Sequence, residues 1–414
     1  MLSYRSKPHC GGQGVYVRHL TRELAALGHT VEVFSGQPYP DLDPGPVLRE
    51  VPSLDLYREP DPFRTPRPGE LRDWIDLLET SLMWGGAFPE PLTFSLRARR
   101  VLGRRQGDFD VVHDNQGLGY GMLRLPLPLV TSIHHPISAD RQIDLASLHG
   151  LQQLSRRRWY GFVRMQARVA RAVGPVITVS ESAKADICRD FRVPAGRVRI
   201  IPLGVDTRMF RPRGGSGVSG PGLGERVPGR IVAVTSADSA LKGTATLLRA
   251  VGKLVTERDV HLIVVGKPGP DTIRLVAELS LLDRVTFTHG LDDTAYAELL
   301  ASAEIAVVPS LYEGFSLPAV EHMASGTALV ASRAGALPEV TGTAPDAAGA
   351  VLVTPGDAEE LAAALLRLHD SPGERVALGE RALRRVSERF SWAAVACATE
   401  ESYRAAIAAE ASRG

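Results

Sequence analysis

The sequence has few lysines, few cysteines and almost no net charge. Only five lysines stand among the 48 basic residues, so arginine fills nearly every generic basic position and a lysine in a loop is notable. The three cysteines are odd in number, far apart and free of metal-ligand spacing, which excludes a cysteine-based zinc site and is typical of a reduced cytoplasmic protein. A formal charge of +1 lacks the basic excess of nucleic-acid-binding proteins, so no nucleic acid partner is expected.

Long apolar runs are also absent. No stretch approaches the ~18 residues of a membrane span, and the first residues lack the charged-then-apolar pattern of a signal peptide. With 44% apolar residues in 414, the chain can still fill a core, and its length exceeds what one hydrophobic core usually organises. Two domains are therefore expected, in a cytoplasmic protein.

A segment rich in glycine and proline separates the two halves. Residues 211–229 hold seven glycines and three prolines in nineteen positions, which is typical of a flexible linker. In each half, short β-branched runs alternate with helical periodicity, so each half is predicted to be a doubly wound parallel sheet of the α/β class. The predicted first domain covers residues 1–210 and the second covers residues 230–390.

The most informative stretch follows a predicted buried strand at residues 303–309. Glu313 lies on the turn after this strand, and Pro318 suits the first turn of the next helix. The turn leaves free backbone N–H groups at the positive end of a helix dipole, which is an anion site suited to phosphate. Glu321, one turn into the helix, can accept hydrogen bonds from a vicinal diol such as a ribose. The ordinary structural alternative is a capping box with a solvated glutamate.

A glycine loop follows the first predicted strand, at residues 1–4. Gly11 and Gly12 open the loop, and a helix with one apolar side follows. The pattern is no dinucleotide fingerprint, because Val17 stands where the third glycine belongs and no acidic residue ends the next strand, so a dehydrogenase is disfavoured. A plain tight turn remains the alternative to a ligand loop. Because the first strand is so short, we expect upstream codons to encode more of it.

Two histidines follow the strand predicted at residues 128–133. His134 thus lies at the carboxyl end of the sheet, where α/β proteins bind ligands, although a lone histidine is often structural. Asp108 and Asp110 match a metal-binding Asp-x-Asp pattern only superficially, because Asp110 opens a strand instead of ending one and no second ligand set follows. No metal site is predicted.

Taken in chain order, these motifs resemble a known family. The Glu-x7-Glu spacing of Glu313 and Glu321 resembles the signature of retaining glycosyltransferases with the GT-B fold, glycosyltransferase family 4 or "glycosyl transferases group 1", which includes sucrose synthases and mannosyltransferases. The resemblance covers nearly the whole chain. It implies two Rossmann-like domains facing across a cleft, the acceptor side first and the nucleotide-sugar side second, with a helix at residues 391–414 packing back on the first domain.

The resemblance also implies roles for single residues. Glu313 would face the donor sugar and His134 would lie by the transferred sugar and phosphate, as the catalytic residues. Lys242 would grip the diphosphate and Glu321 the nucleotide ribose. Further backbone and loop groups would contact the sugar, diphosphate and base. They are Gly11, Gly12, Ser236, Leu291, Gly314, Phe315, Ser316 and Leu317.

One position departs from the family pattern. Members usually carry Gly-Arg early in the loop that ends at Lys242, whereas this chain has Ala237 after Ser236. The departure removes one charge-assisted contact to the donor diphosphate. Three consequences are open: the donor is bound more weakly, an arginine from elsewhere in the chain replaces the contact, or the leaving group needs less neutralisation.

The implied reaction moves a sugar from a nucleotide-diphosphate sugar to an acceptor hydroxyl with retention and without a metal or other cofactor. The acceptor is a glycan, a lipid-linked sugar or a small molecule, and neither the donor base nor the donor sugar is readable. A phosphorylase or sugar-nucleotide epimerase would need a cofactor lysine or an acid–base set that the sequence does not offer. A weakly catalytic or non-catalytic nucleotide-sugar-binding protein is the main alternative.

A basic amphipathic helix is predicted over residues 156–173. Its apolar side includes Trp159 and Val169, and its basic side can meet an anionic membrane surface or an acidic ligand. Solvated arginines over a buried stripe are the simpler interpretation. The basic side consists of Arg157, Arg164, Arg168 and Arg171.

Overall fold

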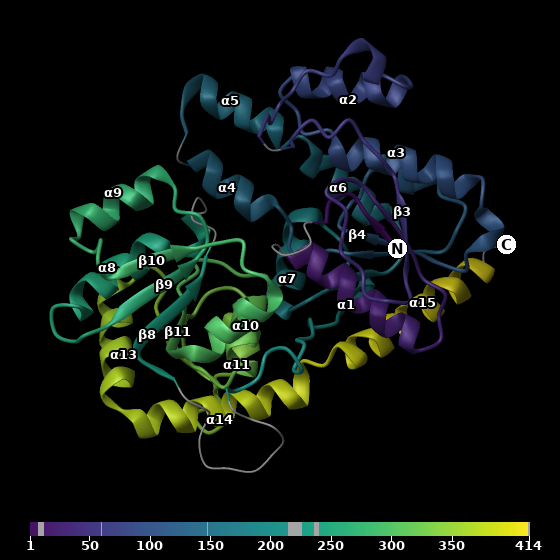
Figure 1. The fold of residues 1–414 in the computed structure, drawn as a ribbon. Helices are drawn as coiled ribbons and strands as arrows, with labels where there is room; N and C mark the ends of the chain where they lie inside the picture. Colours follow the sequence, from purple (N-terminus) through teal and green to yellow (C-terminus); the bar gives the residue numbers. More distant parts are fainter. Residues whose placement is uncertain (7–11, 59, 147, 214–225, 236–239, 413–414) are drawn as a thin grey trace. The chain divides into compact units, whose positions relative to one another are not determined.

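The computed structural model describes residues 1–6, 12–58, 60–146, 148–213, 226–235 and 240–412 (Figure 1). The chain divides into two compact units, one formed by Met1–Pro202 with Ala393–Gly414 and the other by Leu203–Trp392. Each unit contains one sheet in which all pairings are parallel. The predicted α/β class with two doubly wound sheets is confirmed.

The first unit has a seven-stranded sheet in the order β3-β2-β1-β4-β5-β6-β7. The order reverses at β1, so the edge beyond β1 and β4 is the expected ligand edge. Its strands are β1 (Leu2–Ser3), β2 (Glu32–Ser35), β3 (Val47–Glu50), β4 (Val112–Asn115), β5 (Leu129–Ser132), β6 (Val176–Thr178) and β7 (Val198–Ile200). Its helices are α1 (Gly12–Ala26), α2 (Trp74–Trp84), α3 (Glu90–Gly103), α4 (Ser138–Ala146), α5 (Gly150–Trp159), α6 (Phe162–Ala172), α7 (Glu181–Asp186) and α15 (Trp392–Ala411), which joins this unit from Ala393 onward.

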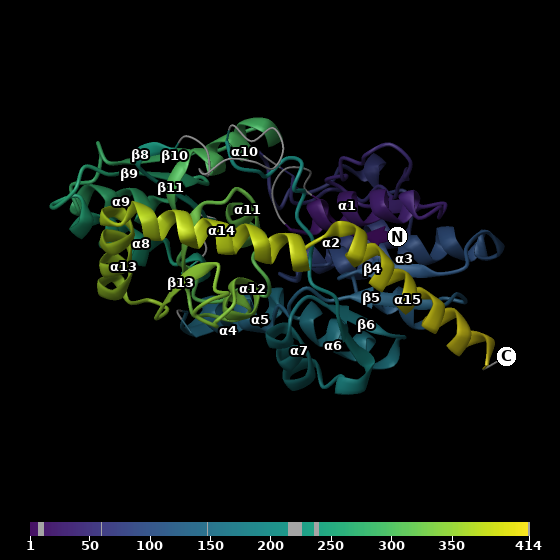
Figure 2. The same cartoon turned by 90° about the horizontal axis from the view of Figure 1, so that it is seen from below.

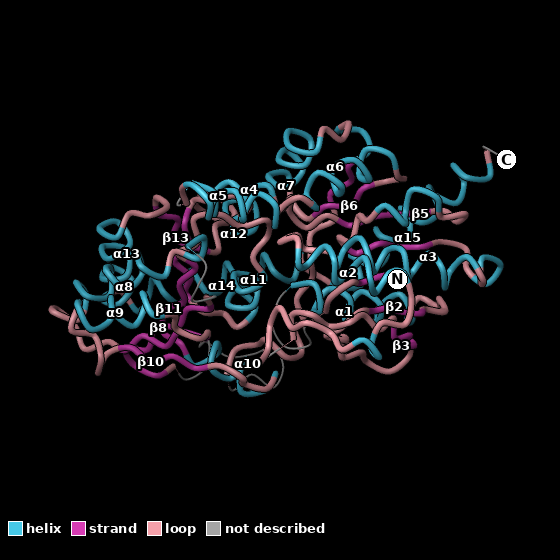
Figure 3. Tube along the Cα trace, turned by 90° about the horizontal axis from the view of Figure 1, so that it is seen from above, coloured by secondary structure: helices cyan, strands magenta, loops and turns pink. Residues whose placement is uncertain are grey.

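The second unit has a six-stranded sheet in the order β10-β9-β8-β11-β12-β13. Its strands are β8 (Val227–Val234), β9 (His261–Val265), β10 (Val285–Thr288), β11 (Ala303–Val308), β12 (Ala328–Ser332) and β13 (Ala350–Val353). Its helices are α8 (Thr244–Leu254), α9 (Pro270–Glu278), α10 (Asp293–Ser302), α11 (Leu317–Ala324), α12 (Leu337–Thr341), α13 (Ala358–Asp370) and α14 (Pro372–Arg389). Figure 3 shows α8, α9 and α13 on one face of this sheet and α10, α11 and α12 on the other.

Both cores are rich in valine, isoleucine and leucine from strands and helices, and the core of the first unit also contains Phe34, Phe94 and Phe191. In the second unit, β11 and β12 are buried along almost their whole length, as strands between two helix layers must be. The chain ends in three helices, α13 to α15, drawn in yellow tones in Figure 2. None of the helices in the described ranges is both long and apolar enough to cross a bilayer.

Several predicted elements differ from the structure. Strand β3, which pairs with β2 at the sheet edge, was not predicted from the sequence. The predicted helix over residues 156–173 is two helices, α5 and α6, separated at Tyr160 and Gly161, so that single-helix prediction is wrong. Strand β8 begins at Val227, inside the segment predicted to be linker, while most of that segment lies outside the described residues.

A buried ionic group holds α2 against α3. Arg97 donates from Nη2 to Asp76 Oδ1 at 2.6 Å and also to Glu79. Asp76 and Glu79 are almost fully buried, so their charges depend on this guanidinium for compensation. Arg72 adds a second contact, from Nε to Asp76 Oδ2 at 3.0 Å.

We predict that Arg97→Ala lowers the free energy of unfolding of the first unit by about 3–5 kcal/mol, because Glu79 then stays buried without a cation and Asp76 keeps only Arg72. Urea unfolding followed by tryptophan fluorescence measures this, since Trp74, Trp84 and Trp159 lie in the first unit. Arg99→Ala on the exposed side of the same helix is the control and should stay within about 0.5 kcal/mol of the wild type. Equal free energies of unfolding of Arg97→Ala and Arg99→Ala would show that Arg97 does not compensate the buried carboxylates.

Candidate active site

An ion pair joins two loops at the carboxyl edge of the second sheet. Glu313, on the turn after β11, accepts from Lys242 Nζ at 2.7 Å and from Ser310 Oγ at 2.7 Å, both through Oε1. Lys242 lies directly before α8, where Gly243 has a φ of 66° and an added Cβ would lie 2.0 Å from the carbonyl oxygen of Pro309. Only glycine lets the two loops approach so closely.

The backbone of Glu313 is fixed as well. Its carbonyl oxygen accepts from Ala336 N at 2.9 Å. Gly335 precedes that donor with a φ of 51°, and a Cβ there would lie 2.2 Å from the same oxygen. The turn after β12 therefore clamps the turn that carries Glu313, so its carboxylate is positioned from two sides.

The turn then runs into α11, as predicted. Ser316 has a φ of 85° and precedes the first helical residue, Leu317, and Pro318 follows in the first turn. The first backbone N–H groups of a helix have no partner within it, so those after Phe315 point outward at the positive end of the dipole. Phe315 anchors the turn by packing edge-on against Phe390, with ring centroids 5.6 Å apart. The arrangement fits an anion-binding site.

Glu321 lies on α11 and is only 8% exposed. Tyr296, on α10, donates from its hydroxyl to Glu321 Oε2 at 2.7 Å. Burial raises the pKa of Glu321 to about 7, against the opposing effect of this hydrogen bond. The carboxyl group is thus close to half-protonated at neutral pH and becomes a better acceptor when a ligand offers donors.

In the first unit, His134 follows β5 at the ligand edge. Its Nε2 lies 2.8 Å from Asn115 Oδ1, and its ring packs edge-on against Tyr16 with centroids 4.6 Å apart. Burial lowers the pKa of His134 to about 3, so the imidazole is neutral. Among the described residues, none hydrogen-bonds its buried Nδ1.

A chain of hydrogen bonds holds the ring of Tyr16. Its hydroxyl lies 3.0 Å from Ser132 Oγ, which in turn lies 2.6 Å from His113 Nε2. His113 Nδ1 reaches the hydroxyl of Tyr403, on α15, at 2.7 Å. The last helix of the chain therefore helps to fix the surroundings of His134.

The predicted site residues fall into three groups. Lys242, Glu313 and the α11 turn meet within the second unit, with Leu291 just before α10 of the same unit. His134 and Gly12 belong to the first unit, where Gly12 is the first residue of α1 instead of part of a loop. The predictions for Gly11 and Ser236, and the departure at Ala237, lie outside the described residues.

Sequence reasoning missed the partners of the two glutamates. Ser310 follows β11 three residues before Glu313, a spacing that a turn could have suggested. Tyr296 gave no signal, because only the packing of α10 against α11 brings it to Glu321.

Family models match both halves of the chain. Residues 10–209 match "Glycosyltransferase Family 4" and residues 228–371 match "Glycosyl transferases group 1". The chain belongs to this glycosyltransferase family. It is 57% identical to the "MMP alpha-(1->4)-mannosyltransferase" of Mycolicibacterium hassiacum, over 99% of this chain and 98% of that protein. It is 33% identical to the "D-inositol 3-phosphate glycosyltransferase" of Mycobacterium tuberculosis, over 96% of this chain and 79% of that protein.

Solved structures share the fold. Sucrose-phosphate synthase from Thermosynechococcus elongatus superposes with a TM-score of 0.73 at 24% identity, covering 99% of both chains. The Anabaena protein HepE, solved with UDP-glucose, superposes with a TM-score of 0.66 at 16% identity, covering 98% of this glycosyltransferase and 99% of HepE. Together these matches confirm the predicted GT-B fold.

We predict that the affinity of the glycosyltransferase for a nucleotide sugar rises about tenfold between about pH 6 and pH 8, as Glu321 ionises through its pKa of about 7. The sequence predicts that Glu321 binds the ribose, and an ionised carboxylate accepts hydrogen bonds from hydroxyl groups more strongly than the neutral acid. Calorimetric titration across this range measures it, and the nucleotide sugar itself has no phosphate that titrates there. Glu321→Gln should bind more weakly and with little dependence on pH. Parallel pH profiles in both proteins would assign the titration to another group.

Proposed function

We propose that this glycosyltransferase is a metal-independent, retaining mannosyltransferase that transfers mannose from a nucleotide-diphosphate donor to a hydroxyl of an α-(1→4)-linked mannoside. The Lys242–Glu313 pair beside the start of α11 carries the proposal, because it combines a cation, an acceptor and an anion site. The α-(1→4)-mannosyltransferase name of the 57% identical relative supports the choice of sugar and linkage.

The chemistry depends on the leaving group. As the bond from the anomeric carbon to the diphosphate breaks, the departing oxygens gain negative charge, which Lys242 and the N–H groups at the start of α11 stabilise. The ligand-free Lys242 is already neutralised by Glu313, so the arriving diphosphate competes for its ammonium group. No metal is needed in this scheme.

Retention follows if the acceptor attacks from the face that the diphosphate leaves. The leaving phosphate oxygen then takes the proton of the acceptor hydroxyl, while that hydroxyl oxygen forms the new bond to the anomeric carbon. An α linkage made from an α-configured donor requires this outcome. In this scheme Glu313 orients the sugar. The imidazole of His134 is neutral, so it can form hydrogen bonds without adding a positive charge.

We predict that replacing Glu321 and replacing Glu313 affect different quantities, nucleotide affinity in the first case and kcat in the second. Glu321→Gln should weaken both nucleoside diphosphate and intact donor, by the ~1.5–3 kcal/mol typical of a hydrogen bond to a charged group. Glu313→Gln should not weaken nucleoside diphosphate binding, because it removes the carboxylate that competes for Lys242. It should lower kcat, because the contact of Glu313 to the sugar is strengthened in the transition state.

Calorimetry with nucleoside diphosphates of guanine, uracil and adenine, together with transfer assays from the matching mannose donors, provides the test. A larger loss of nucleotide affinity in Glu313→Gln than in Glu321→Gln would reverse the assignment. Tight donor binding without transfer to any mannoside would favour a non-catalytic nucleotide-sugar-binding protein instead.

We also propose that the protein is cytoplasmic and touches the inner face of the membrane through its basic side. The side chains of Arg157, Arg164 and Arg168 are exposed on α5 and α6, which supports the idea, whereas Arg171 is engaged with the carbonyl oxygen of Phe191 at 2.8 Å.

Liposome co-sedimentation tests the membrane contact. Binding to anionic vesicles should exceed binding to neutral ones at low salt, and charge reversal at Arg164 and Arg168 should abolish the difference. If anionic and neutral vesicles bind alike, the face is merely solvated.

A further inference from the structure

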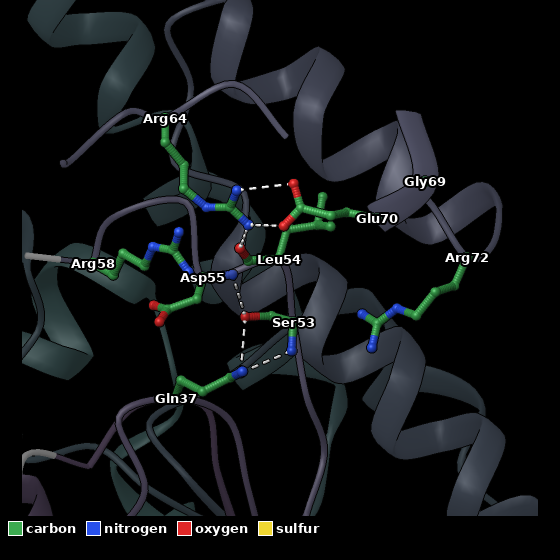
Figure 4. A pocket seen from close by; sticks show the side chains of 9 residues that line it. All are labelled: Gln37, Ser53, Leu54, Asp55, Arg58, Arg64, Gly69, Glu70 and Arg72. Carbon is green, nitrogen blue, oxygen red and sulfur yellow. Dashed lines mark hydrogen bonds and ion pairs between the residues drawn. The ribbon is translucent and has the colours of Figure 1, made fainter. Parts of the chain in front are cut away.

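A cavity of about 340 Å³ opens at the ligand edge of the first sheet (Figure 4). Its lining begins at Gln37, two residues after the end of β2, and continues through Ser53 and Asp55, which follow β3. The cavity therefore belongs to the same edge as His134, which follows β5. None of the roles assigned above uses it.

Much of its wall is held rigidly. Gln37 Oε1 accepts from Ser53 N at 2.8 Å, and Ser53 Oγ accepts from Asp55 N at 3.1 Å. Arg64 forms a bidentate pair with Glu70, with Nη2 at 2.7 Å from Oε1 and Nη1 at 3.1 Å from Oε2. Figure 4 shows this pair between Arg58 and Arg72.

Two charged side chains of the lining are left without such partners. Within the described residues, neither the carboxylate of Asp55 nor the guanidinium of Arg58 has a hydrogen bond or an ion pair. Asp55 has a φ of 49°, in the left-handed region that aspartate and asparagine adopt more readily than other non-glycine residues. A carboxylate and a guanidinium that line a cavity without protein partners suggest a binding role.

The charge balance of the cavity points to a neutral ligand. Arg64 is neutralised by Glu70 and Arg72 by Asp76, so the remaining charges of Asp55 and Arg58 cancel. A ligand that satisfies both needs donors for the carboxylate and acceptors for the guanidinium, without net charge. Sugar hydroxyls supply both.

Exposed aromatic rings flank the same segment. Phe63, next to Arg64, is 58% exposed, and Trp84 is 64% exposed with its Nε1 donating to Thr65 Oγ1 at 3.3 Å. Aromatic faces carry partial negative charge and pack well against the C–H faces of sugar rings. Charged hydrogen-bonding groups on a segment that also carries exposed rings fit a carbohydrate better than an anion.

The sheet order fixes how far this cavity lies from His134 along the edge. Asp55 and Arg58 follow β3, which is separated from β5 by β2, β1 and β4, and this makes four strand spacings or roughly 19 Å. A chain of several sugar residues spans that distance. We propose, building on the proposed mannosyl transfer, that the Asp55–Arg58 cavity binds a distal part of the acceptor chain while its reacting end lies at His134.

The test compares a short with a long acceptor, the disaccharide and the octasaccharide of α-(1→4)-linked mannose. In the wild type, kcat/KM should be higher for the octasaccharide. Arg58→Ala and Asp55→Asn should each lower the octasaccharide-to-disaccharide ratio of kcat/KM about tenfold, the loss of one charge-assisted hydrogen bond. Asparagine tolerates the left-handed conformation at position 55, so this change removes the charge and spares the backbone. Arg99→Ala, on an exposed helix surface, is the matched control and should leave the ratio unchanged.

Calorimetric titration of the octasaccharide without donor separates this proposal from the proposed function. Weaker binding in Arg58→Ala than in the wild type supports the distal site even if no mannose donor reacts. Equal octasaccharide affinity in these two proteins, or the same loss of kcat/KM for both acceptors, overturns it. Absence of transfer from every mannose donor, with octasaccharide binding still sensitive to Arg58, would contradict only the proposed reaction.

Discussion

The contact between Lys242 and Glu313 is the interaction on which the second unit's site depends. It joins the loop after β8 to the turn after β11, and each side is set by a backbone approach that only glycine permits, at Gly243 and at Gly335. These two strands are neighbours in the middle of the sheet, so their loops have little freedom to move apart. Because both loops are fixed in this way, the Lys242–Glu313 pair is already oriented before a ligand binds. The cost of organising the site is therefore met mainly by folding and not by binding.

This pre-organisation has an electrostatic consequence. A free ammonium group and a free carboxylate would each require solvent, whereas the pair keeps the ligand-free turn neutral and compact. In the proposed reaction, an entering diphosphate would bring negative charge to the same ammonium group and to the start of α11. Glu313 would then be less engaged by Lys242 and could accept hydrogen bonds from the hydroxyls of the sugar.

The sequence predicted the parts of this site that depend on local spacing. The strand, turn and helix around Glu313 were predicted because the apolar run before Glu313 and Pro318 after it are local signals, and the scarcity of lysine made Lys242 notable. The break at Tyr160 and Gly161 and the edge strand β3 were missed, because weak local propensities there are decided by packing. Contacts such as Tyr296 with Glu321, or Tyr403 with His113, join residues far apart in sequence and leave no local pattern.

Burial favours the neutral forms of His134 and Glu321, but with different effects near neutral pH. His134, with a pKa lowered to about 3, stays uncharged at every pH at which the protein would work. Glu321, with a pKa raised to about 7, changes charge within that range. A pH dependence of donor binding near neutrality is therefore expected to follow the nucleotide end of the donor and not the sugar end. Because Tyr296 donates to the ionised form of Glu321, the tyrosine sets how close that carboxyl group comes to full ionisation, and Tyr296→Phe should move the transition to higher pH without touching the Lys242–Glu313 pair.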